Sequence, residues 1–414
     1  MVLLLLIYQV VCMYTVSTVF AHRDLAESSF GGDELVVPNI VHQMYDYQSP
    51  SYFLYLSIMT AQHFLKPTKH ILWVNTEGRF RPEHWRSWQA NAQPNSWEHD
   101  FAQLLKSGKI EAKMVVFPAH PPGNSSTNVQ NKAHRSDFLR MEALRDYGGI
   151  YIDTDVFVLR SLDPLRVHDF TMGFDNVVNR DQHAGNARRL INGVMLSVPN
   201  AKFLQVWSSM YATFDPSSWD HHSSVVPFRL AVQYPDLVHV EMNRLSPVSS
   251  GLQTSEAAAA LTCGLLLPES RGIWYPITVD SKPTFVAAPL DTYLYKQLYK
   301  KYVLHMTMSA VRGVSMLRGL LGPDGVKTMP SFLGSVFRQA MHPEGKDTYD
   351  YQQWETKFKA ADASATDAAM AAWNACRTML GMHTPLEAYQ PSKQRAPHDR
   401  QQYVSSQLPP VPAL

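Results

Sequence analysis

Two aspartates, Asp153 and Asp155, stand one residue apart directly after the short apolar run 150–152. Such carboxylates repel each other unless a proton or a cation lies between them. Hard divalent ions prefer carboxylate oxygens and keep coordination positions open for water and phosphate oxygens. The pair therefore predicts a Mg²⁺ or Mn²⁺ site suited to a diphosphate, whereas an arbitrary pattern of this length is more often a solvated turn.

The residues before this pair place it at the end of a buried strand. Residues 132–147 are expected to form a helix, which Gly148 and Gly149 end because glycine adopts the left-handed backbone of a helix C-terminus. Residues 150–152 follow at once as a short buried strand. Ligands bind beyond the carboxyl ends of strands in open α/β sheets, so this placement favours the metal site over the turn.

A second charged pair, Asp137 and Arg140, lies three residues apart on the expected helix, so both side chains face the same side. On spacing alone a surface ion pair is the commoner reading, and it would contribute only ~0.5 kcal/mol. The alternative is that Arg140 contacts a phosphate and Asp137 a sugar hydroxyl, because a guanidinium fork and a carboxylate suit those groups.

The elements around these residues alternate between strand and helix, which predicts an α/β fold with a mostly parallel sheet. Strands are expected at 35–43, 70–74 and 113–117, and a helix at 52–66. Weaker patterns indicate strands or short helices at 193–198, 237–240 and 302–305, and helices at 201–214 and 227–233.

Composition excludes a disordered chain and argues against a nucleic-acid partner. The chain has 414 residues, of which 45% are hydrophobic and 18% charged, so it can bury a substantial core. Lys and Arg total 37 against 36 Asp and Glu. No overall field attracts a polyanion, and nucleic acid is not expected as a partner.

The N-terminal residues 2–20 carry no charged side chain. A bilayer-spanning helix needs roughly 20 apolar residues, and residues 19–21 resemble a signal-peptide cleavage site. An uncleaved membrane anchor and a cleaved signal both remain open for residues 1–21. Either one sends the rest of the chain into the secretory lumen.

Two further features agree with a lumenal compartment. Cys12 lies in the apolar segment, so Cys263 and Cys376 are the remaining candidates for one disulfide, and no zinc spacing exists. Asn124 begins the N-glycosylation sequon Asn-Ser-Ser in a turn-rich stretch. Such sequons are frequent by chance, so this one only supports the assignment.

Three segments in order, 41–43, 136–140 and 147–155, resemble the sugar-transferase region containing the Asp-x-Asp motif of glycosyltransferase family 32. Relatives of that family include yeast Golgi mannosyltransferases and animal α-1,4-galactosyl- and α-1,4-N-acetylglucosaminyltransferases. The resemblance covers roughly residues 38–241. It implies a GT-A fold, a nucleotide-sugar donor, a Mn²⁺ ion and transfer with retention of anomeric configuration.

The resemblance also implies roles for individual residues. Asp155 would bind the metal, and Asp153 would contact the metal or the donor's ribose and sugar. Asp137 and Arg140 would bind the donor's sugar and phosphate. A nucleotide pocket would be lined by the segment that contains Val41, His42, Gln43 and Tyr45, with Tyr45 under the base.

Other positions are weaker candidates. Asn192 resembles a residue on the donor-sugar or acceptor side, although a plain Asn-Gly turn explains it equally well. His305 would lie near the metal or the diphosphate, but Met306 replaces the family's Trp, and a core histidine is an even alternative. His221 and His222 resemble part of a substrate-facing loop, where paired histidines are usually surface residues.

The expected organisation is a signal anchor or signal peptide (1–21), a stem (22–34), a GT-A domain (35–310), a C-terminal helical extension (311–389) and a disordered tail (390–414). Such a protein would sit in the Golgi membrane with a lumenal catalytic domain, or be secreted after cleavage.

The expected function is metal-dependent, retaining transfer of a sugar, preferably from a UDP-sugar, to a glycan or glycolipid acceptor. Three alternatives stay open: a GDP-mannose-dependent mannosyltransferase, a catalytically silent relative that binds nucleotide or carbohydrate, and a hydrolase of sugar nucleotides.

Overall fold

A computed structural model describes residues 34–46, 49–77, 82–175, 189–241, 244–245, 274–279, 282–287, 301–305, 322–328 and 332–343. The expected N-terminal segment, Cys263, Cys376 and the tail lie outside these residues. Within them, no helix is both long and apolar enough to cross a membrane.

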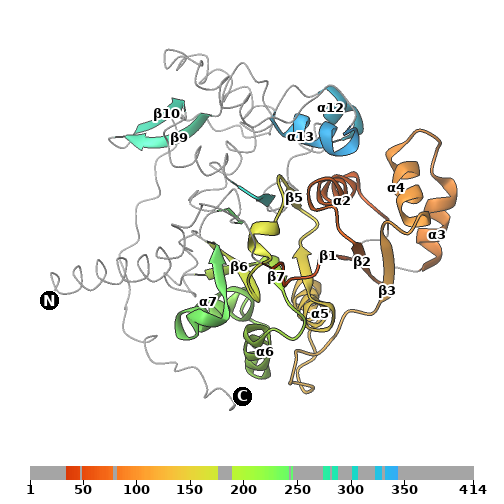
Figure 1. The fold of residues 1–414 in the computed structure, drawn as a ribbon. Helices are drawn as coiled ribbons and strands as arrows, with labels where there is room; N and C mark the ends of the chain where they lie inside the picture. The colour runs from red at the N-terminus through yellow and green to blue at the C-terminus, as the bar shows by residue number, and fades with distance from the viewer. Residues whose placement is uncertain are drawn as a thin grey trace.

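A seven-stranded sheet forms the centre of the described part, in the order β3-β2-β1-β4-β7-β6-β8 (Figure 1). Neighbours are parallel except β7, which runs antiparallel to both β4 and β6. The sheet is thus mixed but mostly parallel. Its strands are β1 (Ile40–Tyr45), β2 (Lys69–Asn75), β3 (Glu111–Val115), β4 (Gly149–Ile152), β6 (Phe170–Asp175), β7 (Arg189–Ser197) and β8 (His239–Glu241).

Helices cover both faces of this sheet. One face packs on α5 (Lys132–Tyr147), α6 (Lys202–Ser209) and α7 (Val226–Gln233), and the other on α2 (Tyr52–Leu65), α3 (Pro82–Asn91) and α4 (Trp97–Lys106). Side chains alternate along β2: Ile71 and Trp73 join the first core, Leu72 and Val74 the second. This explains the nearly continuous apolar strands.

Short helical turns complete the connections between these elements. They are the 3₁₀ turns η1 (Asp163–Leu165), η2 (Met210–Thr213) and η4 (Pro235–Leu237) and the π-helical turn η3 (His221–Val225). The helix expected at 201–214 is therefore split, because α6 ends at Ser209 and tightens into η2.

Two strands differ from their expected bounds. β1 begins at Ile40 instead of residue 35, because the backbone amides of Val36 and Val37 donate to the carbonyl of Arg166 rather than to a strand. Pro38 has no amide hydrogen to donate to a ladder. β3 ends at Val115 rather than at residue 117, and Val116 is 62% exposed.

A smaller antiparallel pair lies beside the sheet. It joins β5 (Val156–Val158) to β11 (Val303–His305), with His305 opposite Val156. A separate hairpin consists of β9 (Trp274–Val279) and β10 (Lys282–Ala287).

Two helices fall within the expected C-terminal extension, α12 (Pro323–Thr328) and α13 (Phe332–Met341). The second packs against α2 and β5 (Figure 1). Its Phe337 ring lies 4.7 Å from Phe157 of β5, edge to face. The part of the extension that the structure describes is thus helical, and the domain boundaries themselves stay a prediction.

Candidate metal centre

The aspartate pair is positioned by a capped helix and a glycine turn. The side chain of Asn131 caps α5 by accepting a hydrogen bond from the amide of Ala133. Gly148 and Gly149 have positive φ angles of 62° and 102°. A Cβ on Gly149 would lie 2.3 Å from the carbonyl oxygen of Ile40. Glycine is therefore required where α5 turns into β4 beside β1, immediately before Asp153.

His305 joins Asp153 and Asp155 from a distant part of the chain. One ligand atom from each of the three lies within 4.8 Å of the others. His305 Nε2 is 3.3 Å from Asp155 Oδ1 and 3.9 Å from Asp153 Oδ2. Burial lowers the pKa of His305, but the two aspartates outweigh it and the net shift is upward. The two aspartates thus create a negative potential that favours a positive charge between them and His305.

This donor set fits a hard or borderline divalent cation, because two carboxylates and an imidazole are ligands that Mn²⁺ and Mg²⁺ accept. The backbone at Gly193 leaves room for these ligands to come together. A Cβ on Gly193 would lie 2.7 Å from Asp153 Oδ2 and 2.7 Å from His305 Cε1. Glycine at this position lets the carboxylate and the imidazole approach each other.

Arg140 lies inside the protein and holds Asp153 in place. Its Nη1 is 3.3 Å from Asp153 Oδ1 and donates to the carbonyl of Asn192 at 2.9 Å. Its guanidinium lies 4.4 Å from the Tyr151 ring, whose hydroxyl donates to Asp153 Oδ1 at 2.5 Å. With its side chain 7% exposed, Arg140 orients a candidate ligand; phosphate contact stays a prediction.

The expected ion pair between Asp137 and Arg140 exists, at 3.2 Å, but it is buried instead of lying on the surface. The Asn192 amide donates to Asp137 Oδ1 at 2.8 Å. Burial, opposed by Arg140, raises the pKa of Asp137. The three side chains form one connected unit behind the metal centre.

Asn192 lies within β7 rather than in a plain turn. The register between β6 and β7 shifts there, because Met172 pairs with Met195 while Gly173 pairs with Ile191. Such a bulge redirects the side chains of the extra residues. It accounts for Asn192 reaching α5 and for Gly193 lying beside the metal centre.

The β1 residues expected in a nucleotide pocket are core residues here. Val41, His42 and Gln43 are 0% exposed and Tyr45 is 3% exposed. His42 Nδ1 accepts from Trp73 Nε1 at 3.2 Å, and His42 Nε2 lies 2.9 Å from the carbonyl of Gly148. Burial lowers the pKa of His42 to about 4. These side chains support the strand, and nucleotide contact stays a prediction for this segment.

The histidines of the expected loop are not a surface pair. His222 is 5% exposed, in η3, and its carbonyl accepts from Trp207 Nε1 at 2.8 Å. Its ring packs 5.4 Å from Tyr211. His221 is partly exposed. His222 therefore belongs to the core around η2 and η3.

Two polar groups at the same edge of the sheet were missed from the sequence. At the ends of β1 and β2, Asp46 accepts from Asn75 at 2.8 Å and pairs with Lys132 at 2.7 Å. At the end of β6 and the start of β7, Arg189 pairs with Asp220 and lies 3.8 Å from Asp175. Asp46 directly follows β1 and Asp175 is the last residue of β6, so a search for polar residues at the carboxyl ends of strands, as at Asp153, could have found both.

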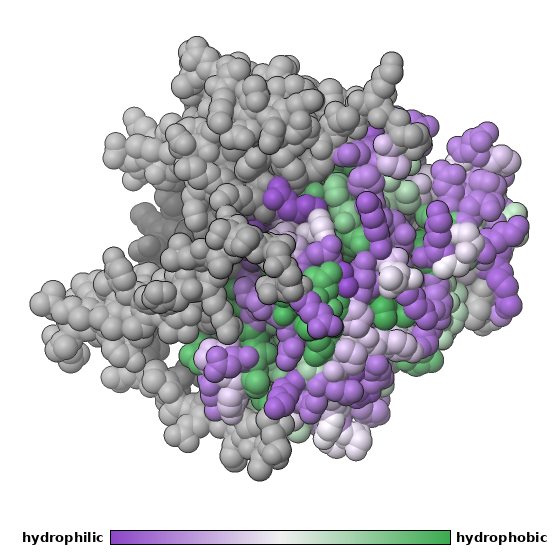
Figure 2. Space-filling view, viewed as in Figure 1, coloured by the Kyte–Doolittle hydropathy of each residue, from purple (hydrophilic) through white to green (hydrophobic). Residues whose placement is uncertain are grey.

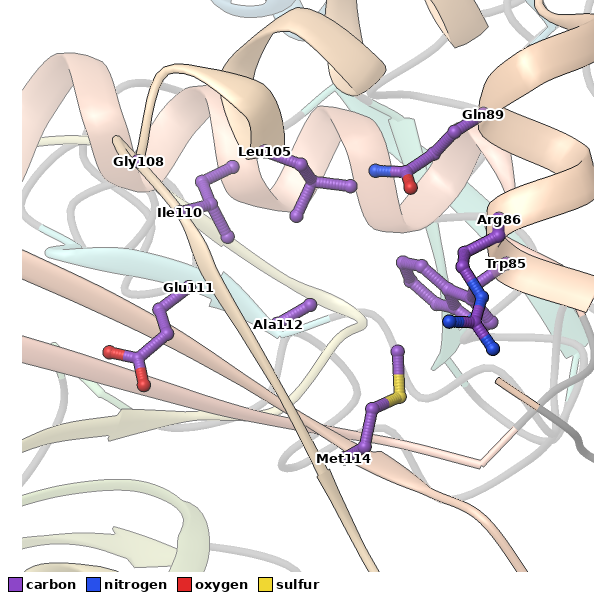
Figure 3. A pocket seen from close by; sticks show the side chains of 9 residues that line it. All are labelled: Trp85, Arg86, Gln89, Leu105, Gly108, Ile110, Glu111, Ala112 and Met114. Atoms are coloured by element: carbon purple, nitrogen blue, oxygen red, sulfur yellow. The ribbon is translucent and has the colours of Figure 1, made fainter. Parts of the chain in front are cut away.

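A separate pocket of about 570 Å³ lies under α3 and α4, against the outer strand β3 (Figure 3). The apolar part of its lining comes from Trp85, Leu105, Ile110 and Met114, and Glu111 is the one acidic residue among the described residues that line it. Hydrophilic side chains cover the surface over α3 and α4 (Figure 2). β1 and β2 separate β3 from β4 in the sheet, so this pocket is distinct from the metal centre.

Comparison with known families agrees with this geometry. Residues 80–171 match the family described as glycosyltransferase sugar-binding region containing DXD motif. The matched region contains Asp137, Arg140, Asp153 and Asp155, whereas His305 lies outside it. The expected resemblance and the glycosyltransferase class of this region are confirmed.

Two curated relatives align with parts of the chain. Glucan organizing enzyme 1 of Cryptococcus neoformans var. grubii is 36% identical over 116 residues, 28% of this chain and 32% of that protein. An uncharacterized protein of Arabidopsis thaliana is 37% identical over 84 residues, 20% of this chain and 11% of that protein. The alignments thus span a third or less of these relatives.

Among solved structures, the galactosyltransferase LgtC in complex with donor and acceptor sugar analogs aligns at 14% identity and a TM-score of 0.29. That alignment covers 76% of this chain and 99% of LgtC.

Proposed function

We propose that this chain is a metal-dependent glycosyltransferase of GT-A type that moves a sugar from a nucleotide-sugar donor to a glycan or glycolipid acceptor. The observation that carries the proposal is the meeting of Asp153, Asp155 and His305 at the carboxyl edge of the sheet. Two of the three belong to the matched glycosyltransferase region.

Asp153, Asp155 and His305 would hold the divalent ion, and the remaining chemistry is mainly electrostatic. A bound divalent ion supplies positive charge against a diphosphate leaving group. Arg140 and Tyr151 keep Asp153 Oδ1 occupied, which leaves Oδ2 directed toward His305. The chain's contribution is thus a pre-oriented carboxylate that need not reorganise when the donor binds.

In the proposed transfer, the bond between the anomeric carbon and the diphosphate breaks as the acceptor oxygen bonds to that carbon. The acceptor's proton goes to the departing diphosphate. Retention of configuration follows if acceptor and leaving group share one face of the sugar. A UDP-sugar is our preferred donor over GDP-mannose, by the family resemblance.

We further propose a secretory location, Golgi membrane in preference to secretion after cleavage, with membrane attachment through the N-terminal segment. It rests on the uncharged residues 2–20. Asn124, the sequon residue, is partly exposed, and its amide donates to the carbonyl of Ala212 at 3.0 Å.

The proposal is tested by incubating the full chain with a panel of UDP- and GDP-sugars, with and without Mn²⁺, in the presence of saccharide acceptors. We expect one donor to be consumed only with metal. Asp155→Asn should lower transfer about 1,000-fold, equivalent to ~4 kcal/mol in the barrier. The exposed Asp236→Asn serves as the matched control and should leave transfer unchanged.

Other outcomes would replace the proposal. Binding of a donor without turnover would make the chain a silent relative. Consumption of a donor with water alone, whichever acceptor is offered, would make it a sugar-nucleotide hydrolase. Turnover that Mn²⁺ does not affect would remove the metal from the mechanism.

A further inference from the structure

The strand that delivers His305 is only three residues long, so its position depends on what holds it. β11 pairs with β5 along its whole length. The carbonyl of Tyr302, just before β11, accepts from the amide of Leu159 at 2.9 Å. These bonds fix β11 beside β5, with His305 opposite Val156, the residue after Asp155.

A second set of contacts holds the start of β11 from the segment after β8, the outer strand of the sheet. The amide of Tyr302 donates to the carbonyl of Arg244 at 3.0 Å. Arg244 Nη1 is 3.3 Å from the Tyr302 hydroxyl, and its guanidinium lies 4.9 Å from the Tyr302 ring. Arg244 therefore contacts Tyr302 through backbone, hydroxyl and ring.

Arg244 is itself held by Glu241 at the end of β8. Its Nε is 3.1 Å from Glu241 Oε1 and its Nη2 is 3.0 Å from Oε2, a two-point contact between guanidinium and carboxylate. The Glu241 side chain is 4% exposed. Burial raises the pKa of Glu241, but contacts with His239 and Arg244 outweigh it and lower the pKa to about 2.

The residue after Arg244 fastens this segment to the sheet. Leu245 is 0% exposed, and a Cβ on Gly173 of β6 would lie 2.8 Å from the Leu245 Cβ. The backbone at Arg244 is thus held between a packed leucine and a partly buried ion pair. A fixed point of this kind can determine where Tyr302, and hence the strand after it, lies.

We propose that Glu241, Arg244 and Tyr302 are positioning residues for the metal centre, acting through His305. The inference rests on the metal site of the proposed function. None of the three is in the cation-binding group. Their effect resembles that of outer residues that orient metal ligands, whose loss typically costs 10- to 100-fold in metal affinity.

The test measures the dissociation constant of Mn²⁺ for the full chain by titration with electron paramagnetic resonance. Arg244→Lys keeps the charge but loses the two-point contact with Glu241, and we expect about tenfold weaker binding. Arg166→Lys is the matched control, because Arg166 also pairs with an acid three residues away, Asp163, but does not contact Tyr302. It should leave the affinity unchanged.

A double-mutant cycle identifies the route of the effect. In a His305→Ala background, Arg244→Lys should have no further effect on Mn²⁺ affinity. Equal weakening with and without His305 would overturn the proposal, as would an unchanged affinity in Arg244→Lys. If that variant does not fold, Tyr302→Phe replaces it; removing one hydroxyl, and with it one hydrogen bond, should weaken binding about threefold, again only when His305 is present.

This readout separates the inference from the proposed function. A wild-type chain that binds Mn²⁺ with the expected mutant pattern but transfers no sugar would refute the function and leave the inference standing. A wild-type chain that binds no Mn²⁺ would refute the inference.

Discussion

The metal centre draws on two regions that are built in opposite ways. Residues 131–155 form one continuous block, with a capped helix, a two-glycine turn and a strand at the centre of the sheet. β11 is a three-residue strand outside the central sheet, held by its pairing with β5, by the segment at Arg244 and by the packing of Val303 in the core. The carboxylates are thus placed by local sequence, whereas the imidazole is placed by tertiary contacts.

The comparison predicts unequal losses when each region is broken. Asp153→Asn removes a charge from the block, and we expect about 1,000-fold weaker Mn²⁺ binding, ~4 kcal/mol. His305→Gln removes a neutral ligand and should cost only about 10- to 100-fold. Calorimetric titration of both variants would measure the difference. Equal losses would show that His305, on β11, contributes as much to Mn²⁺ affinity as Asp153 does.

Acid should weaken the support that β1 gives the block, where His42 Nε2 lies 2.9 Å from the Gly148 carbonyl, before it weakens the support of β11. The folded pKa of His42 is about 4, below its ordinary 6.5, so its contribution to stability is complete above pH 6.5 and falls as pH drops toward 4. From pH 7 to pH 5 this loss is about 2 kcal/mol. The contribution of Glu241 falls only between its ordinary pKa of 4.5 and about 2.

Urea unfolding at several pH values measures this window. His70, whose pKa burial lowers to about 3, adds a similar acid dependence. His42→Asn should therefore reduce the slope of stability against pH between 7 and 5, without abolishing it. A slope unchanged in the variant would mean that His42 does not titrate in this way.

A smaller effect than these is predicted for Gly193, where the two regions meet. Because a Cβ there would overlap both Asp153 and His305, Gly193→Ala should push the ligands apart and weaken Mn²⁺ binding about tenfold, ~1.4 kcal/mol. Unfolding temperature serves as the control and should change little. Unaltered affinity would show that the ligands can shift together at no cost.

Sequence alone predicted the block closely. The expected helix, 132–147, coincides with α5, and the expected strand at 150–152 differs from β4 by one residue. Both are governed by local signals, the Asn131 cap and the two glycines. Strand direction is not local: nothing in residues 189–197 indicates that β7 runs antiparallel to its neighbours.

The sequence predicted the candidate site less well than it predicted the fold. Spacing predicted that Asp137 and Arg140 would meet, but the burial of their ion pair comes from Tyr151 and Asn192, which other elements supply. His42 and Gln43 were expected in a nucleotide pocket through the resemblance; the structure buries both in the sheet, and nucleotide contact stays a prediction. His305 was reached only through resemblance, because no local pattern connects it to the aspartates.

The distance along the chain between the aspartates and their histidine partner has a consequence for synthesis. His305 follows Asp155 by about 150 residues, which a ribosome adds in roughly 10 to 30 s at the usual rates. During that interval the sheet around β4 can fold, although β11, the strand that pairs with β5, has not yet been synthesised. The nascent chain would thus acquire its carboxylates first and become competent to retain a metal only late in translation.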